Sequence, residues 1–233
     1  NQKFHTDYWN PTSYPTVVAD ILSLGKGVGG KGTYNLENGE LSGGGETVGE
    51  AGIGIFNQGK MPRATKHTAA VLTLGGLSSG VGTYNLASGE LISAVQNIGM
   101  AGNGTLNQSG GSNNVASLNL GMLAGGVGTY NLSNGGLTVT AESIGVAGSG
   151  TFNQTGSSHQ VVSLSIGSEY GSSGTYNLSA GSLNALAETI GVAGEGAEHH
   201  RRQDEARELR FRRRLEQHLG ELEAAGGGGV RER

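Results

Sequence analysis

Three glutamates and one glutamine recur at nearly fixed intervals, and they are the first residues to consider for chemistry. Glu142 and Glu188 are 46 residues apart, Gln96 lies 46 residues before Glu142, and Glu46 lies 50 residues before Gln96. Paired carboxylates can act as general acid and general base on a glycosidic bond. In a stack of repeats, copies on alternate turns would lie about 9–10 Å apart, which superficially fits an inverting pair. The regular recurrence instead favours a solvated ladder, so we predict no catalytic residue and no enzyme activity.

The histidines are a second set that could do chemistry, as metal ligands. His5, His67 and His159 fall in the variable part of one type of repeat, where alternate turns could bring two of them together. No carboxylate cluster accompanies them, so we predict surface histidines. Calcium-binding solenoids need Asp in GGxGxD turns, and the Gly-rich turns of this chain lack Asp. Glycine strings such as 25–32 lack the sequence context of a phosphate loop. We therefore predict no metal and no cofactor.

The composition bounds the classes of function further. The 233 residues include 45 Gly and no Cys, and the formal net charge is −4 at pH 7. Without Cys there is no disulfide framework, thiolate metal site or Cys nucleophile. The net negative charge gives no case for binding nucleic acid. No run of about 18 apolar residues occurs, so we predict no membrane insertion by this segment.

An internal repeat determines the elements that would position these residues. The motif GTYN alternates with a second motif, G-(I/T)-(F/L)-NQ. The interval is 22 residues from Tyr130 to Phe152 and 24 residues from Phe152 to Tyr176, and four extra residues lie between Gln58 and Val71. Short runs of Thr, Val, Ile, Tyr and Leu between Gly, Asn and Ser are typical of strands and turns. The unit is therefore a pair of rungs of 22 and 24 residues.

These rungs predict an all-β fold, a parallel β-helix (solenoid) of alternating 22- and 24-residue rungs. Within one rung we predict three short strands, for example 128–132, 137–141 and 143–147. A β-propeller with blades of about 46 residues is the alternative, and it is disfavoured because each unit splits into two near-equal halves.

Equivalent residues of stacked rungs form ladders. We expect an inward apolar ladder at Tyr34, Phe56, Tyr84, Leu106, Tyr130, Phe152 and Tyr176, and another at Val48, Leu74, Ile98, Leu120, Ile144, Ile166 and Ile190, each followed by Gly. We expect a structural ladder of hydrogen-bonded amides at Asn35, Asn57, Asn85, Asn107, Asn131, Asn153 and Asn177. The residue after each of these Asn alternates between Leu and Gln, which a simple inward/outward rule does not explain.

The regular pattern covers residues 1–196, which we interpret as a fragment of a longer array because Asn1-Gln2 already lies inside a rung. Insertions at 3–16 and 59–70 belong to the same rung type and should leave along one edge. The first is aromatic, and Tyr8, Trp9 and Tyr14 are candidates for a binding loop, although covering an edge of the solenoid is the favoured interpretation. Residues 197–233 are a charged, Arg-rich tail, either a helix or disordered, and an out-of-frame reading of a Gly-rich gene is the interpretation we favour.

The run GTYNLSNGGLTV…SIGVAGSGTFNQTG…LSIG resembles the autotransporter-passenger-like β-strand repeats of bacterial surface and exported proteins. The resemblance covers about residues 1–196. It implies a right-handed parallel β-helix, an extracellular or cell-surface location associated with the outer membrane, and a role as adhesin or scaffold. The matching positions are structural, so no functional residue is carried over.

These observations predict a structural and adhesive segment, a rigid spacer that displays its edge loops to a host-surface or polysaccharide ligand. The alternative is a carbohydrate-active or carbohydrate-binding β-helix protein whose catalytic part lies outside this chain.

Overall fold

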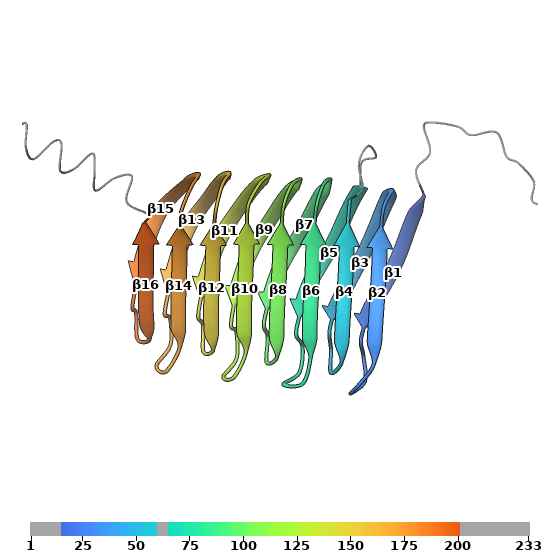
Figure 1. Ribbon diagram of the computed structural model, residues 1–233, viewed down its shortest axis with the longest axis horizontal. Helices are drawn as coiled ribbons and strands as arrows, with labels where there is room; N and C mark the ends of the chain where they lie inside the picture. Colours follow the sequence, from blue (N-terminus) through green and yellow to red (C-terminus); the bar gives the residue numbers. More distant parts are fainter. Residues whose placement is uncertain (1–14, 60–64, 201–233) are drawn as a thin grey trace, which may run out of the picture. The chain divides into compact units, whose positions relative to one another are not determined.

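The computed structural model describes residues 15–59 and 65–200. These residues contain sixteen β-strands and no helix, and the strands form two parallel sheets of eight strands each (Figure 1). The order is β1-β3-β5-β7-β9-β11-β13-β15 in one sheet, here sheet A, and β16-β14-β12-β10-β8-β6-β4-β2 in the other, sheet B. Neighbours in each sheet are two strands apart in the chain, so the chain alternates between the sheets. The predicted β-solenoid is confirmed.

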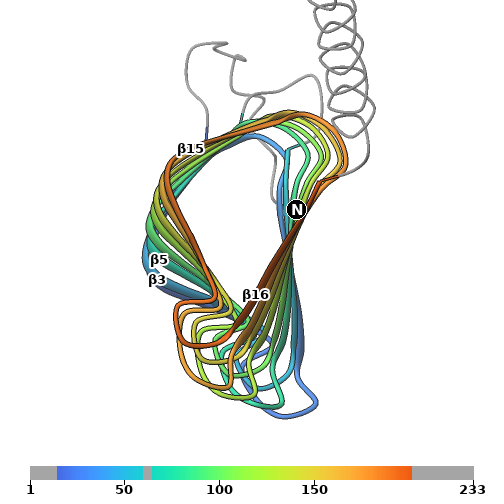
Figure 2. The same ribbon diagram turned by 90° about the vertical axis from the view of Figure 1, so that its left-hand side faces the viewer.

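Sheet A is built from the longer strands, which have nine or ten residues. They are β1 (Thr16–Leu24), β3 (Gly39–Val48), β5 (Thr65–Leu74), β7 (Glu90–Ile98), β9 (Ser112–Leu120), β11 (Gly136–Ile144), β13 (Ser158–Ile166) and β15 (Ser182–Ile190). Viewed along the solenoid in Figure 2, these strands curve around one side of the cross-section.

Sheet B is built from strands of six residues, which are straight in the same view. They are β2 (Lys31–Leu36), β4 (Ile53–Gln58), β6 (Val81–Leu86), β8 (Asn103–Gln108), β10 (Val127–Leu132), β12 (Ser149–Gln154), β14 (Ser173–Leu178) and β16 (Glu195–His200). The last strand runs four residues beyond the predicted end of the array at Gly196.

The register of the strands follows the sequence repeat. Tyr130 pairs with Phe152, and Phe152 pairs with Tyr176. We call a sheet B strand and the sheet A strand after it a rung: Tyr-type rungs begin with β2, β6, β10 and β14, and Phe-type rungs begin with β4, β8 and β12. Residues 60–64 join β4 to β5, and residues 1–14 precede β1, so both insertions adjoin the starts of sheet A strands. Residues 65–70 of the predicted second insertion belong to β5.

Each rung contains two strands, where the sequence predicted three. Within β11, the paired residues pass from Val139 directly to Ala141, so Thr140 has no ladder partner. Thr140 and Ala141 are both exposed, which resets the alternation and lets Glu142 point inward after Val139. A local bend inside one continuous strand therefore produces the break that the sequence pattern suggested, and no turn separates two strands there.

The core contains the two predicted apolar ladders. From Phe56 to Tyr176 the members of the aromatic ladder are fully buried, and neighbouring rings stack, with centroids 4.7 Å apart for Phe56 and Tyr84. Burying each such side chain contributes roughly 1.5–3 kcal/mol. The second ladder, which begins at Val48, is equally buried as far as Ile166, whereas its last predicted member, Ile190 on β15, is 44% exposed.

Glycine after that second ladder has a definite steric reason. Gly145 has a φ of 71°, and a Cβ there would lie 2.3 Å from the carbonyl oxygen of Ser173, the first residue of β14. Only glycine meets both conditions. The corner that ends each sheet A strand is thereby fixed by sequence.

Candidate functional site

The carboxylates and histidines singled out for chemistry lie inside the solenoid. Glu46 and Glu142 are 1% exposed, and His67 and His159 are 0% exposed. The predicted solvated glutamate ladder and surface histidines are therefore wrong for these four residues. The physical reason is the alternation of sheet A: Thr65, His67 and Ala69 are buried, and Lys66 between them is exposed.

The remaining members of those two sets differ. Glu188 occupies the same rung position as Glu142 but lies on β15, the last strand of sheet A among the described residues. It is exposed there because no further described strand stacks on that end. Gln96 is fully buried. His5 lies outside the described residues, as do Tyr8, Trp9 and Tyr14 and the tail from residue 201 onward. The predictions for those residues stay predictions.

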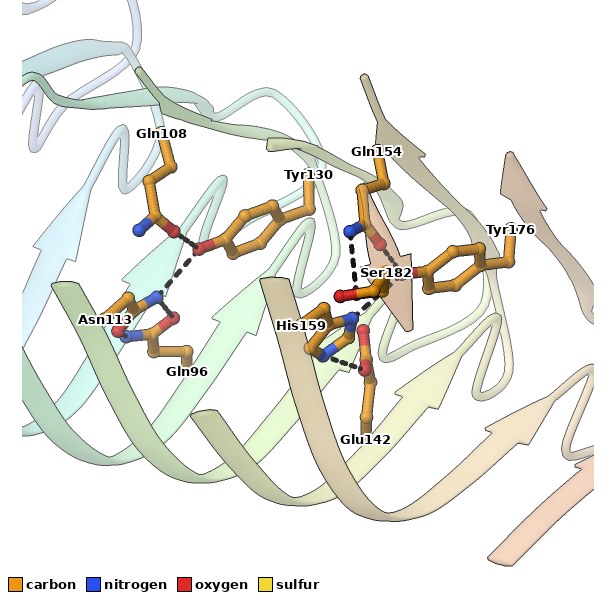
Figure 3. A network of polar contacts seen from close by, with 9 residues as sticks. All are labelled: Gln96, Gln108, Asn113, Tyr130, Glu142, Gln154, His159, Tyr176 and Ser182. Atoms are coloured by element: carbon orange, nitrogen blue, oxygen red, sulfur yellow. Dashed lines mark hydrogen bonds and ion pairs between the residues drawn. The ribbon is translucent and has the colours of Figure 1, made fainter. Parts of the chain in front are cut away.

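Each buried histidine belongs to a polar cluster that spans three successive rungs, and Figure 3 shows the one around His159. Its hydrogen-bond directions can be derived from the backbone. Gln154 donates through Nε2 to the carbonyl of Ser182, 3.1 Å away, so its Oε1 must face Tyr176. The Tyr176 hydroxyl donates to that oxygen at 2.5 Å. The same hydroxyl must then accept from Nδ1 of His159 at 2.9 Å.

The other nitrogen of His159 faces the buried carboxylate. Nε2 lies 3.0 Å from Oε2 of Glu142, but the two atoms are not aligned as a hydrogen bond, and both oxygens of Glu142 lack a hydrogen-bond partner. His159 and Glu142 therefore form a close pair, charged or neutral, that is not a hydrogen bond.

The cluster around His67 has the same order and better alignment. Gln58 donates to the carbonyl of Glu90 at 2.8 Å, and the Tyr84 hydroxyl donates to Gln58. Nδ1 of His67 lies 2.7 Å from that hydroxyl, and Nε2 lies 2.7 Å from Oε2 of Glu46. Since Nδ1 must carry hydrogen, a single proton lies between Nε2 and the carboxylate. Either a neutral pair or an ion pair results, and both have zero net charge.

The middle cluster replaces the histidine and the glutamate with amides (Figure 3). Gln108 donates to the carbonyl of Gly136 at 2.9 Å and accepts from the Tyr130 hydroxyl at 2.5 Å. Asn113 donates to that hydroxyl at 3.0 Å. Asn113 and Gln96 then exchange two hydrogen bonds, of 2.8 and 3.0 Å. At equivalent positions, His67, Asn113 and His159 thus each lie between the tyrosine hydroxyl of the next rung and the buried Glu or Gln side chain of the preceding rung.

Burial changes the acidity of the three tyrosines at the centres of these clusters. Desolvation raises the pKa of Tyr84 well above its ordinary value, and the charge of Glu46 raises it further. Desolvation also raises the pKa of Tyr130, against a smaller lowering by the Asn113 hydrogen bond. For Tyr176 the pKa is raised first by desolvation and then by Glu142. All three phenols stay protonated and can serve as donors in the folded chain.

This arrangement explains the alternation of Leu and Gln after the ladder asparagines. Gln58, Gln108 and Gln154 each accept from the tyrosine of the following Tyr-type rung. Leucine stands in the rungs followed by Phe56, Leu106 or Phe152, which have no hydroxyl. The sequence carries a signal for the clusters, since His or Asn precedes its tyrosine by 17 residues in all three.

The chemistry that the clusters can perform is limited by their burial. Their side chains are 0–1% exposed, so a substrate cannot reach them in the folded chain. The part of the chain that the structure describes contains no group of three or more residues suited to hold a metal ion and no helix long and apolar enough to span a membrane. The clusters therefore act by satisfying polar groups inside the stack.

The predicted asparagine ladder lies on the outer face of sheet B. Each Asn donates through Nδ2 to Oδ1 of the Asn on the preceding rung, from Asn57 to Asn35 at 2.8 Å through to Asn177 to Asn153 at 2.9 Å. Each bond contributes about 1 kcal/mol. The ladder links the described rungs of sheet B from β2 to β14.

The chain matches no protein-family model, no curated protein and no solved structure.

Proposed function

We propose that this chain is a structural and adhesive segment of a bacterial surface or secreted protein, acting as a rigid spacer that displays loops along one edge. The observation that carries the proposal is the unbroken asparagine ladder, which ties every described rung from Asn35 to Asn177 to its neighbour. The parallel pairing within both sheets adds backbone hydrogen bonds between the same rungs. Bending or stretching such a stack breaks many bonds together.

The buried clusters support the same role. Each joins three successive rungs through side chains, for example Glu142, His159 and Tyr176 on β11, β13 and β14. Cross-links between sheet A and sheet B resist a change in the cross-section, whereas the asparagine ladder resists separation of the rungs. The location outside the cell rests on the resemblance of the repeat to bacterial surface proteins.

A carbohydrate-binding or carbohydrate-active protein is the second candidate, with any catalytic part outside this chain. One observation favours it: the outer face of sheet B between Ile53 and Asn177 presents hydroxyl and amide groups together with a few Ile and Val side chains, and no charge.

An adhesion assay separates the spacer from a carbohydrate-active protein. Beads coated with the full chain are passed over host-cell surfaces and polysaccharide films under flow, and the medium is assayed for released sugar. We expect retention of the beads on at least one surface without release of sugar. Depolymerisation of a film would contradict the spacer proposal and favour the second candidate, and failure to be retained on any surface would contradict the adhesive role. Beads coated with heat-unfolded chain are the control.

A further inference from the structure

The outer face of sheet B is a repetitive surface on which Thr and Asn recur and no charge lies between its ends. In the strands from β4 to β12 the second, fourth and sixth residues are buried, so the first, third and fifth point outward, as Val127, Thr129 and Asn131 do in β10. The sequence repeat extends the same pattern to β14. Figure 1 shows the strands of this sheet side by side, facing the viewer. The third position is Thr in five consecutive strands from β6 to β14, at Thr83, Thr105, Thr129, Thr151 and Thr175. The fifth position is the asparagine ladder.

The surface carries no charge over six strands. From β4 to β14 its outward positions are Ile, Val, Asn, Ser and Thr only. The nearest outward charges on the same sheet are Lys31 on β2 and Glu195 on β16, at its two ends. Sheet A differs, since its outward positions include Glu40 and Lys66.

The ladder asparagines are held in one orientation and still have unused hydrogen-bonding capacity. Asn107 donates one N–H to Asn85 and accepts one bond from Asn131. A side-chain amide has two N–H donors and two acceptor lone pairs. One donor and one acceptor therefore remain on each interior Asn, repeated about every 4.8 Å along the stack. Because the ladder already fixes these asparagine side chains, the protein would lose little further side-chain entropy when a ligand binds to them.

We propose that this face, the Thr–Asn face of β6 to β14, binds an extended uncharged polysaccharide whose chain runs along the solenoid axis. A neutral sugar polymer offers hydroxyl groups that both donate and accept at regular intervals, which the face matches. Nucleic acid and anionic polysaccharides require cations, and none lies on the face. Protein interfaces depend on buried Trp, Tyr or Arg anchors, and the face presents none of these. The inference rests on the proposed adhesive function and names its ligand class.

The test uses the full chain and a pair of matched variants. Thr105→Lys with Thr151→Lys places two charges on the Thr–Asn face, two strands apart. Thr138→Lys with Asn184→Lys places two charges on outward, exposed positions of sheet A, also two strands apart in that sheet. Circular dichroism and thermal melting establish that both variants fold like the parent chain.

Sedimentation binding is then measured with insoluble cellulose, β-glucan and mannan, and with an alginate gel as the anionic comparison. We expect the parent chain to bind at least one neutral polysaccharide, the sheet A variant to bind equally, and the Thr–Asn variant to bind at least tenfold more weakly. Equal loss in both variants, unchanged binding of the Thr–Asn variant, preference for alginate, or self-association of the chain through this face would overturn the inference. Adhesion to host cells with no binding to neutral polysaccharides would refute this inference alone, and retention on no surface would refute the adhesive function too.

Discussion

The polar clusters around Asn113 and His159 fill equivalent places in the same solenoid but satisfy their atoms differently. In the amide cluster every hydrogen-bonding atom of Asn113 and Gln96 has a partner. In the histidine cluster, both oxygens of Glu142 and Nε2 of His159 lack a hydrogen-bond partner. A buried polar atom without a partner costs about 1–3 kcal/mol. The same position in the fold therefore accepts either cluster, although the histidine cluster leaves more buried polar atoms without a hydrogen-bond partner.

The difference lies in the number of donors. The amides of Asn113 and Gln96 supply four N–H groups, and these fixed donors reach four different acceptors. The His–Glu pair shares one proton, and the His67 cluster leaves Oε1 of Glu46 without a partner even where its geometry is good. What the pair adds is an aromatic ring, since His67 stacks on Phe56 with centroids 4.7 Å apart. At the amide cluster, Leu106 stands in the position of this Phe. A histidine therefore occurs only in the clusters that have a Phe ring for it to stack on.

The largest effect is expected from removing one partner of a His–Glu pair. His67→Leu leaves Glu46 buried without its partner, which should lower the free energy of unfolding by about 3–5 kcal/mol. Urea denaturation of the full chain measures it. Leucine suits the site sterically, because Leu41 and Leu91 flank His67 in the same ladder.

The control is the double variant His67→Leu with Glu46→Leu. An apolar pair removes the buried polar groups together and should recover most of the loss, and Leu72 already occupies the neighbouring position of the Glu46 ladder. Equal destabilisation of the single and double variants would show that packing, and not the unpaired carboxylate, dominates.

A smaller loss is expected from breaking the cluster at its glutamine. Gln108→Leu deprives the Tyr130 hydroxyl of its acceptor and the Gly136 carbonyl of a donor, so we expect a loss of about 1–3 kcal/mol. Adding Tyr130→Phe should restore part of it, because the variant then repeats the arrangement of Leu132 before Phe152. A double-mutant cycle from urea melts measures the coupling, and additive losses would contradict a hydrogen bond between these residues.

Alkaline pH tests the tyrosines of all three clusters. In the unfolded chain they ionise near their ordinary pKa of 10.0, whereas burial raises the pKa of the folded Tyr84, Tyr130 and Tyr176. Their stabilisation is thus intact below pH 10 and falls as pH rises above it, by about 1.4 kcal/mol per pH unit for each phenol that stays protonated. Tyr130→Phe should reduce this slope by the contribution of one phenol, about 1.4 kcal/mol per pH unit, in urea titrations from pH 9 to 11.5. An unchanged slope would mean that Tyr130 ionises in the folded chain.

The sequence predicted the ladders because each one repeats one kind of side chain at every rung, the amide at Asn107 and its equivalents or an apolar group at Ile98 and its equivalents. It did not predict the clusters, because their members lie on different rungs and alternate in type. The sequence predicts a surface position for His67, since a polar residue beside an insertion usually lies there. Its interior partners are Glu46 on the preceding rung and Tyr84 on the next one. The bend at Thr140 was also not predicted, since no turn residue marks it.

The smallest effect is expected from converting one cluster into the other. His159→Asn with Glu142→Gln copies the pair Asn113 and Gln96 into the next cluster, where Gln154 and Tyr176 already match Gln108 and Tyr130. The amides would satisfy more atoms, but the ring of His159, which stacks on Phe152 with centroids 5.0 Å apart, would be lost. Stacking contributes about 0.5–1.5 kcal/mol, similar to the hydrogen bonds gained. We therefore expect the free energy of unfolding to change by less than about 1 kcal/mol in urea melts. His159→Asn alone, which leaves the Glu142 side chain without the imidazole beside it, should be less stable than the double variant at pH 7. A double variant as unstable as that single one would show that the two cluster types are not interchangeable.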